Sequence, residues 1–219
     1  MMITKRTLDF LKALKKNNNR EWFDVNRSKY EEAKADFEKF VETLLPLLSK
    51  ENSKLKDLKV KDCVFRIYRD VRFSKNKDPD KTNCGAYFVE GGKKSSKAGY
   101  YIQIEPGNSF LAGGCWMPEA PVLKAIRQEI DYNLKDFEKI VKGKVFKSRF
   151  GEMTDARLKT TPKGYDAENP AINYLRQTSF TVMASIKDKD LSGAAFTKEA
   201  AKAYKEMLPF LKFLNVAQD

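Results

Sequence analysis

The spacing of hydrophobic residues predicts helices at both ends of the chain. Thr4 is placed to cap a first helix that ends near Asn17. Asn18 is placed to cap a second helix, in which hydrophobic residues recur at helical spacing as far as Leu48. The same spacing predicts further helices over residues 118–134, 137–143, 170–175 and 196–214.

A hydrophobic residue at every second position predicts strands in the middle of the chain. Over residues 60–73 this alternation places hydrophobic side chains on one side of an extended segment and Arg66, Asp70 and Arg72 on the other. Arg69 interrupts the alternation, which indicates either a bulge or a partnered arginine. Further strands are predicted over residues 86–89, 100–105, 109–116 and 180–186.

The order of these elements predicts an α+β fold. Helices come first, then strands that follow one another closely, then helices again, which is typical of an antiparallel sheet packed by N-terminal and C-terminal helices. We expect a single domain over residues 1–219. Pro106 and Gly107 form a turn signal between two strands. A two-residue turn there would place these side chains on one face of a hairpin: Tyr101, Gln103, Glu105, Phe110 and Ala112.

The composition excludes several classes of protein. The 219 residues include no histidine, which rules out Ser-His-Asp and Cys-His triads and histidine-ligated zinc. The three cysteines form no C-x-x-C, so we expect no disulfide framework and no cysteine-only zinc site. The phosphate-binding and dinucleotide-binding glycine motifs do not occur, and we expect no cofactor and no metal. Apolar runs long enough for a membrane span or a signal peptide are missing, so we expect a cytoplasmic protein.

Positive charge is concentrated in one part of the chain. Lys and Arg number 42 against 30 Asp and Glu, a net charge of +12, and residues 59–100 hold eleven basic and five acidic residues. Such an excess indicates a phosphate-bearing or polyanionic partner, or else only a lysine-rich surface.

The basic side chains of residues 65–81 form the first candidate site. A guanidinium can bind phosphate or carboxylate through two hydrogen bonds at once. The candidate ligand-binding residues are Arg66, Arg69, Arg72, Lys75 and Lys81, with Asp70 to orient the arginines. The alternative is an ion-pair network that ties this segment to the acidic face of the long helix.

A second candidate site combines Tyr101, Gln103 and Glu105. Without histidine, proton transfer near neutral pH falls to Glu, Asp, Lys, Tyr or Cys with a shifted pKa. Asp70 and Glu105 are the catalytic candidates for a hydrolase or transferase that acts on an acidic or phosphorylated small molecule. The alternative is a solvated sheet face.

A third group lies in an irregular loop that contains glycine and proline. It consists of Arg157, Lys159, Lys163 and Tyr165. Basic residues beside an aromatic ring could hold a nucleotide or a single strand.

Four sequence runs together resemble one bacterial family. They are NNNREWFDVNRSKY (17–30), FRIYRDVRFSKNKDPDK (65–81), YYIQIEPGNSFLAGGCWMPE (100–119) and RLKTTPKGYDAENPA (157–171). The closing PFLKFLN (209–215) also fits. In these runs the chain resembles the family catalogued as domain of unknown function 2461. The resemblance implies a single-domain cytoplasmic protein and brings no activity with it.

Two positions depart from that family pattern. Asp80 stands where relatives usually have tyrosine, and Asn169 stands where many have histidine. No role specific to a tyrosine or histidine side chain is therefore carried over to these positions. An asparagine before Pro170 can cap a helix unaided, which favours binding or architecture over catalysis.

The residues and the resemblance lead to one expectation of function. We expect a protein that binds an anionic small molecule through the arginine-rich segment. The alternatives are the histidine-free enzyme and a purely structural or interaction protein. The sequence has no helix-turn-helix, zinc-finger or RNP pattern, so we do not expect nucleic acid as a partner.

Overall fold

The computed structural model describes residues 3–218, which form ten α-helices, one short 3-10 helix and four strands. The first helices are α1 (Lys5–Lys16), α2 (Arg20–Val25), α3 (Arg27–Glu51), η1 (Ser53–Leu55) and α4 (Val60–Cys63). The strands are β1 (Cys84–Phe88), β2 (Gly99–Ile104), β3 (Ser109–Cys115) and β4 (Phe180–Ile186). The remaining helices are α5 (Ala120–Tyr132), α6 (Leu134–Val141), α7 (Lys144–Phe150), α8 (Ile172–Leu175), α9 (Asp188–Leu191) and α10 (Phe196–Val216).

This arrangement confirms the predicted α+β fold with an antiparallel sheet. The prediction of a single domain over residues 1–219 stays a prediction, and residues 1, 2 and 219 lie outside the described part of the chain. Within residues 3–218, no helix has both the length and the apolar composition needed to cross a membrane.

The four strands form one antiparallel sheet in the order β1-β2-β3-β4. In the central hairpin Tyr101 lies opposite Ala112 and Gln103 lies opposite Phe110, which confirms the shared face predicted from the turn signal. Met183 of β4 lies opposite Ala112 and continues that face. Because alternate side chains point to opposite sides of a sheet, the residues between these positions point the other way.

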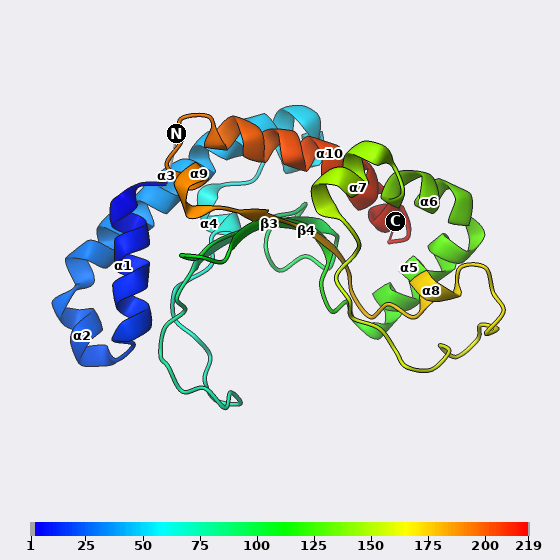
Figure 1. Ribbon diagram of the computed structural model, residues 1–219, viewed down its shortest axis with the longest axis horizontal. Helices are drawn as coiled ribbons and strands as arrows, with labels where there is room; N and C mark the ends of the chain where they lie inside the picture. The colour runs from blue at the N-terminus through cyan, green and yellow to red at the C-terminus, as the bar shows by residue number, and fades with distance from the viewer. Residues whose placement is uncertain (1–2, 219) are drawn as a thin grey trace.

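Helices cover only one face of the sheet. Helices α3 and α10 pack on it, and α1 packs on α3 (Figure 1). On this face the Tyr100 ring lies 4.9 Å from the ring of Tyr204 in α10. The Tyr204 hydroxyl donates to the backbone oxygen of Tyr101 at 2.8 Å, which ties α10 to β2. The opposite face has no helix over it within the described part of the chain (Figure 1).

Helices α5 to α8 form a lobe around the C-terminal part of α10. The rings of Phe137 and Phe146 lie 6.2 and 5.6 Å from Phe210 of α10. A second lobe, formed by α1, α2 and the first part of α3, lies at the other end of the sheet (Figure 1). The molecule is therefore an arch, and the uncovered sheet face lies beneath it.

Two glycines of β3 allow close packing on both sides. Gly114 has a φ of +129°, and a Cβ there would lie 1.9 Å from the backbone oxygen of Phe180. A Cβ on Gly113 would lie 2.1 Å from Sδ of Met207 in α10. A side chain at either position would therefore collide with its neighbour, the backbone of β4 at Gly114 and the Met207 side chain at Gly113.

The prediction of a strand over residues 60–73 is wrong. Its first four residues form α4, and the rest makes only isolated bridges to β1 and to its own returning arm. Ile67 is 5 % exposed, but Phe73 is 96 % exposed. Alternation stabilises a strand where one of its faces is buried. Among the described residues no layer covers the second half of this segment, so it leaves the sheet as a loop.

The predicted second helix is interrupted near its start. Asn26 separates α2 from α3. The N-cap of α2 is Asn19, whose Oδ1 accepts from the backbone N–H of Trp22 at 2.9 Å, and not Asn18 as predicted. The helix predicted from Pro118 begins at residue 120 instead. Helices α4, α7 and α9 and the 3-10 helix η1 were not anticipated by the hydrophobic spacing, because elements this short show little periodicity.

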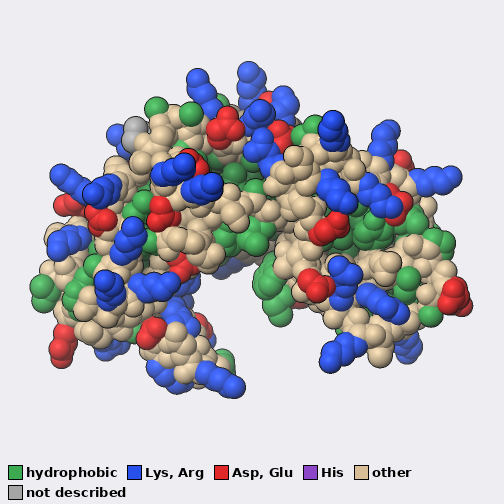
Figure 2. Space-filling model, in the orientation of Figure 1, with side chains coloured by type: hydrophobic (Ala, Val, Ile, Leu, Met, Phe, Trp, Pro, Cys, Tyr) green, Lys and Arg blue, Asp and Glu red, His purple; other side chains and the backbone are tan. Residues whose placement is uncertain are grey.

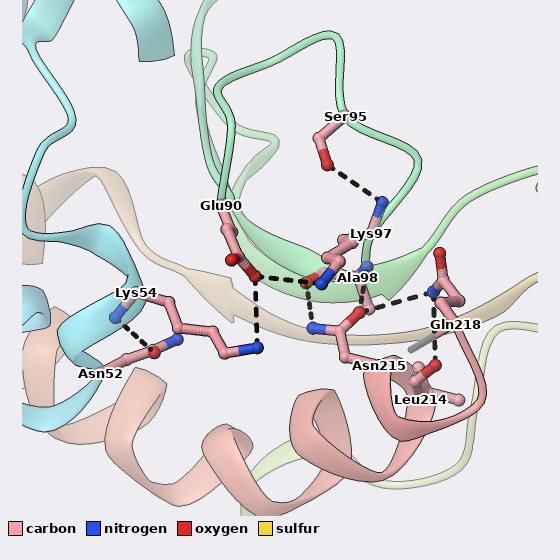
Figure 3. Close-up of polar contacts among 9 residues, drawn as sticks. All are labelled: Asn52, Lys54, Glu90, Ser95, Lys97, Ala98, Leu214, Asn215 and Gln218. Atoms are coloured by element: carbon pink, nitrogen blue, oxygen red, sulfur yellow. Dashed lines mark hydrogen bonds and ion pairs between the residues drawn. The ribbon is translucent and has the colours of Figure 1, made fainter.

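The glycine- and lysine-rich loop after β1 is tied to its surroundings at both ends. Asn215 of α10 donates from Nδ2 to the backbone oxygen of Ala98 at 3.0 Å and accepts from the Ala98 N–H at 2.8 Å (Figure 3). Glu90 pairs with Lys54 at 3.4 Å and with Lys97 at 3.2 Å (Figure 3). These contacts hold the loop against η1 and the end of α10.

Candidate functional site

The candidate ligand-binding residues lie on one protruding loop, residues 64–83, which we call the cationic loop. It holds six basic and three acidic residues and extends from the edge strand β1 beside the uncovered sheet face (Figure 1). Two backbone hydrogen bonds join its arms. Arg69 N donates to Pro79 O at 2.9 Å, and Lys81 N donates to Ile67 O at 2.8 Å. The base of the loop is thus fixed, while its tip extends into solvent.

Contacts with the first lobe hold the base of the cationic loop. Asn18 donates from Nδ2 to the backbone oxygen of Asp80 at 2.9 Å, and its Oδ1 accepts from the Asp80 N–H at 3.1 Å. The ring of Tyr68 lies 6.0 Å from the ring of Phe23 in α2. An asparagine side chain and a ring contact therefore attach the loop to the helices.

The Asp80 side chain is buried at this attachment point. The residue is 3 % exposed, and within residues 3–218 its Oδ1 has no hydrogen-bond partner. Burial raises the pKa of the Asp80 carboxyl. The aspartate that replaces the family's usual tyrosine therefore sits inside the base of the loop, where it cannot face a ligand.

Two of the three arginines have partners within the loop. Arg72 donates from Nε and Nη2 to the two carboxylate oxygens of Asp70 at 2.9 and 2.6 Å. These bonds, with a smaller contribution from Arg66, lower the pKa of the exposed Asp70 carboxyl. Arg69 donates from Nη2 to Oγ of Ser74 at 3.2 Å. Asp70 therefore orients Arg72, and a different side chain holds Arg69.

Arg66 and Lys81 lie close together at the base of the loop. Nζ of Lys81 donates to the backbone oxygen of Arg66 at 2.8 Å and lies 5.6 Å from the ring centre of Phe65. Burial lowers the pKa of Lys81, and the positive charge of Arg66 lowers it further. Within residues 3–218 the Arg66 guanidinium makes no hydrogen bond or ion pair. Lys75 is exposed near the tip.

Glu105 lies at the end of a hydrogen-bonded row on the uncovered face. The Tyr101 hydroxyl donates to Oε1 of Gln103 at 3.1 Å, and Nε2 of Gln103 donates to Oε2 of Glu105 at 2.8 Å. Thr82 and Asn108 also donate to this carboxylate, at 3.1 and 3.2 Å. The Glu105 side chain is only 13 % exposed. It connects the hairpin turn to the returning arm of the cationic loop.

The third candidate group lies on the opposite lobe. Residues 157–165 form an irregular segment, as predicted, with Lys159 and Lys163 exposed. Nε of Arg157 pairs with Oδ1 of Asp155 at 2.9 Å. Tyr165 lies beside α5, near Arg127. The structure therefore places this group and the cationic loop at opposite ends of the sheet.

Asn169 has a structural role in this chain. Its Oδ1 accepts from the backbone N–H of Ala171 at 2.7 Å, just before α8, and its Nδ2 donates to Oδ1 of Asp131 in α5 at 2.7 Å. Both ends of the amide are thus used to fix the start of α8 against α5. The position where many relatives have histidine serves architecture here.

A hollow lies between the two lobes (Figure 2), at the place where the ribbon has the uncovered sheet face (Figure 1). Lysine and arginine side chains occur on both lobes beside it (Figure 2). Two cavities lie elsewhere: one of about 640 Å³ next to Ser53 and Gly91, and one of about 570 Å³ next to Phe146 and Pro209. Neither is lined by a candidate residue. No cluster of three His, Cys, Asp or Glu side chains suited to a metal occurs in residues 3–218.

A comparison with known protein families gives a match over nearly the whole chain. A family model described as a conserved hypothetical protein (DUF2461) matches residues 6–213. The chain belongs to this family. Membership of DUF2461 confirms the resemblance carried by the four sequence runs, and it assigns no reaction. Neither a curated protein nor a solved structure matches the chain.

Sequence reasoning missed the residue that anchors the cationic loop. Asn18 follows Asn17 and precedes Asn19, and one asparagine is enough to cap α2. The run therefore contains more asparagines than the cap needs, and this was the only sign in the sequence that Asn18 has another role. The partner of Asn18 lies 62 positions away in the sequence, so the spacing of residues carries no information about the contact.

Proposed function

We propose that this chain binds an anionic ligand, one that carries phosphate or carboxylate, through the cationic loop. Arg66 and Lys81 would form the centre of the site. Arg69, Arg72 and Lys75 would add positive charge around it, because charge on one side of a hollow raises the local concentration of anions.

The observation that carries this proposal is the free guanidinium of Arg66. It is exposed, it has no hydrogen-bond partner within residues 3–218, and the positive charge of Lys81 lies beside it. Asp70 is the nearby carboxylate, but both of its oxygens already accept from Arg72. An anion bound at Arg66 would remove the repulsion between the two cations and gain charge-assisted hydrogen bonds.

The alternative of a structural ion-pair network has less support. Such a network would join the loop to the acidic face of α3. The bidentate pair of Arg72 and Asp70 instead closes within the loop, where it is exposed and contributes little to stability. The attachment to the helices uses Asn18 and Tyr68, which are neutral. The arginines are therefore not needed to hold the loop in place.

The histidine-free enzyme also has less support than binding. A general base works best with a pKa near the working pH. The pKa of Asp70 is lowered by its bond to Arg72, which makes this carboxylate a weaker base. Glu105 already accepts hydrogen bonds at both oxygens from Thr82, Gln103 and Asn108. Neither carboxylate is available to a substrate without breaking existing contacts.

Calorimetric titration of the purified protein with inorganic phosphate, pyrophosphate and ATP tests the proposal. We expect binding that weakens as salt is added. The double variant Arg66→Ala with Arg72→Ala should weaken it by about tenfold or more, since hydrogen bonds to charged groups contribute roughly 1.5–3 kcal/mol each. Its melting temperature should stay near that of the parent, because both side chains are exposed.

The matched control is Lys198→Ala with Lys202→Ala. Both lysines are exposed on α10, on the other side of the sheet, and their removal changes the net charge by the same amount. This control should bind all three probes as the parent does. Absence of binding by the parent, or equal weakening in the two double variants, would overturn the proposal.

A further inference from the structure

A row of three aromatic rings crosses from the uncovered sheet face to the cationic loop. The Tyr101 ring on β2 lies 5.8 Å from the Phe110 ring on β3 and 6.3 Å from the Phe65 ring at the start of the loop. We call Phe65, Tyr101 and Phe110 the aromatic row. Residue 85 of β1 is glycine, and a Cβ there would lie 2.8 Å from the Tyr101 hydroxyl. The missing side chain lets the Tyr101 ring lie across β1 toward the loop.

The aromatic row is partly exposed and ends at a positive charge. Phe65 is 37 % exposed, and Tyr101 and Phe110 are partly exposed. Lys81 lies over the Phe65 ring at 5.6 Å, and Arg66 is the next residue along the chain. A ligand that reached from the loop onto the sheet would therefore meet a cation first and aromatic side chains next.

Positive charge lies on both sides of the hollow that contains this row. The cationic loop supplies it on one side, and residues 157–163 supply three basic and no acidic residues on the other. Figure 2 shows lysine and arginine side chains on both lobes. A partner that fits between them is a chain with repeated negative charge, because a single small anion would contact only one side.

We infer that the uncovered face and the cationic loop bind a single-stranded polynucleotide. This inference rests on the proposed function, since the phosphates of the strand would be the anions that Arg66 and Lys81 take. The bases would stack on the aromatic row. Unpaired bases offer their faces to aromatic side chains, whereas the bases of a duplex are already stacked on one another. The sequence motifs did not indicate this partner, because the three rings lie in different elements and meet only in the fold.

A single-stranded polynucleotide combines negative charge with planar bases, and other polyanions lack the bases. An acidic peptide or inorganic polyphosphate matches the charge on the two lobes but has no planar bases for the aromatic row. Stacking on rings depends little on which base is present, so binding should show little sequence preference. RNA and DNA single strands share this chemistry and are compared as two arms of the test.

Fluorescence anisotropy with labelled oligothymidylate and oligouridylate of about twelve nucleotides tests the inference. Inorganic polyphosphate, poly-glutamate and a DNA duplex serve as unlabelled competitors. We expect at least one single strand to bind, and the competitors to displace it poorly at equal charge. The variant Phe65→Leu with Phe110→Leu should weaken binding by about tenfold or more, because a base stacked on a ring contributes strongly to affinity.

Leucine is apolar and somewhat smaller than phenylalanine, and both positions are partly exposed, so the variant should fold. Calorimetric titration with pyrophosphate checks that its cationic loop is intact. The control is Tyr132→Leu, which removes a ring that is 74 % exposed outside the aromatic row and should leave affinity unchanged. Suppose that pyrophosphate binds. The inference then fails, and the proposed function stands, if the competitors displace the labelled strand as well as unlabelled strand does. The same conclusion holds if the Phe65 and Phe110 variant binds the strand as the parent does. If neither pyrophosphate nor a single strand binds, both fail.

Discussion

Asp80 is a carboxylate buried at the base of the cationic loop. Its backbone N–H and C=O are both held by the Asn18 side chain, which fixes the main chain at this position. Its Oδ1 lacks a partner within the described residues. Burying a charge that is neither paired nor fully hydrogen-bonded costs folding free energy. Asp80 therefore weakens the native state at neutral pH.

The variant Asp80→Asn should accordingly be more stable than the parent at neutral pH. Removing the buried charge should raise the free energy of unfolding by about 1 kcal/mol, or roughly 2–4 °C in Tm for a chain of this size. The pKa of Asp80 is raised in the folded state, so the native protein holds this proton at pH values where the unfolded chain has lost it. The stability of the parent thus falls as pH rises through the folded pKa, and the advantage of the asparagine variant appears over the same interval.

Thermal unfolding followed by circular dichroism between about pH 4 and pH 8 measures this difference. The control is Asp78→Asn, an exposed carboxylate of the same loop, whose Tm should follow that of the parent at every pH. An asparagine variant at position 80 that melts below the parent at neutral pH would contradict the prediction, since it would mean that the carboxylate has a stabilising partner.

At the scale of elements, one side chain joins α10 to the start of β2. Asn215 makes two hydrogen bonds with Ala98, which is only 4 % exposed (Figure 3). The variant Asn215→Ala would leave a buried N–H and a buried C=O unpaired. We expect a loss of about 2–4 kcal/mol in the free energy of unfolding.

Amide hydrogen exchange locates this effect within the molecule. Protection should fall at Ala98 and Gly99, where β2 begins, and stay unchanged in β4 under native conditions. The control is Lys212→Ala, one turn earlier on the exposed side of α10, which should change neither stability nor exchange. Equal loss of protection throughout the sheet in the Asn215 variant would count against a local role.

Elements whose signals are local were predicted well. The strand over Phe180–Ile186 has the predicted bounds, and the first helix agrees to within one residue at each end. The hairpin register followed from its turn and alternation, because both are set by neighbours in the sequence. Residues 60–73 had the same alternation but formed a loop, since alternation becomes a strand only when another layer buries one face. That layer is a property of the whole fold.

The candidate site was predictable only in part for the same reason. The basic residues of the loop and the shared face of Tyr101 and Phe110 were visible in the sequence. The contact of Phe65 with Tyr101 joins positions 36 residues apart and depends on the loop leaving β1 at its edge. No spacing rule relates such positions. The roles of the loop residues as ligand contacts stay a prediction.

At the scale of the whole molecule, the sheet separates two different surfaces. One face is buried under α3 and α10 and supplies the core, while the other is left open between two lobes with basic side chains (Figures 1 and 2). The net charge of +12 makes the long-range field attractive to polyanions in any orientation. Overall charge and local contacts therefore both favour binding of a polyanion, and a measurement that separates them is needed.

Salt dependence provides that separation. For a single strand, the logarithm of the binding constant falls with the logarithm of salt concentration by about 0.7 for each phosphate that a lysine or arginine neutralises. If Arg66 and Arg72 each contact one phosphate, their joint replacement by alanine should reduce the slope by about 1.4, measured by anisotropy with oligothymidylate. The control Lys198→Ala with Lys202→Ala makes the same change in net charge on α10 and should leave the slope unaltered. Equal slopes in the two double variants would mean that the strand responds to the overall charge of the molecule, and the cationic loop would then not be its binding site.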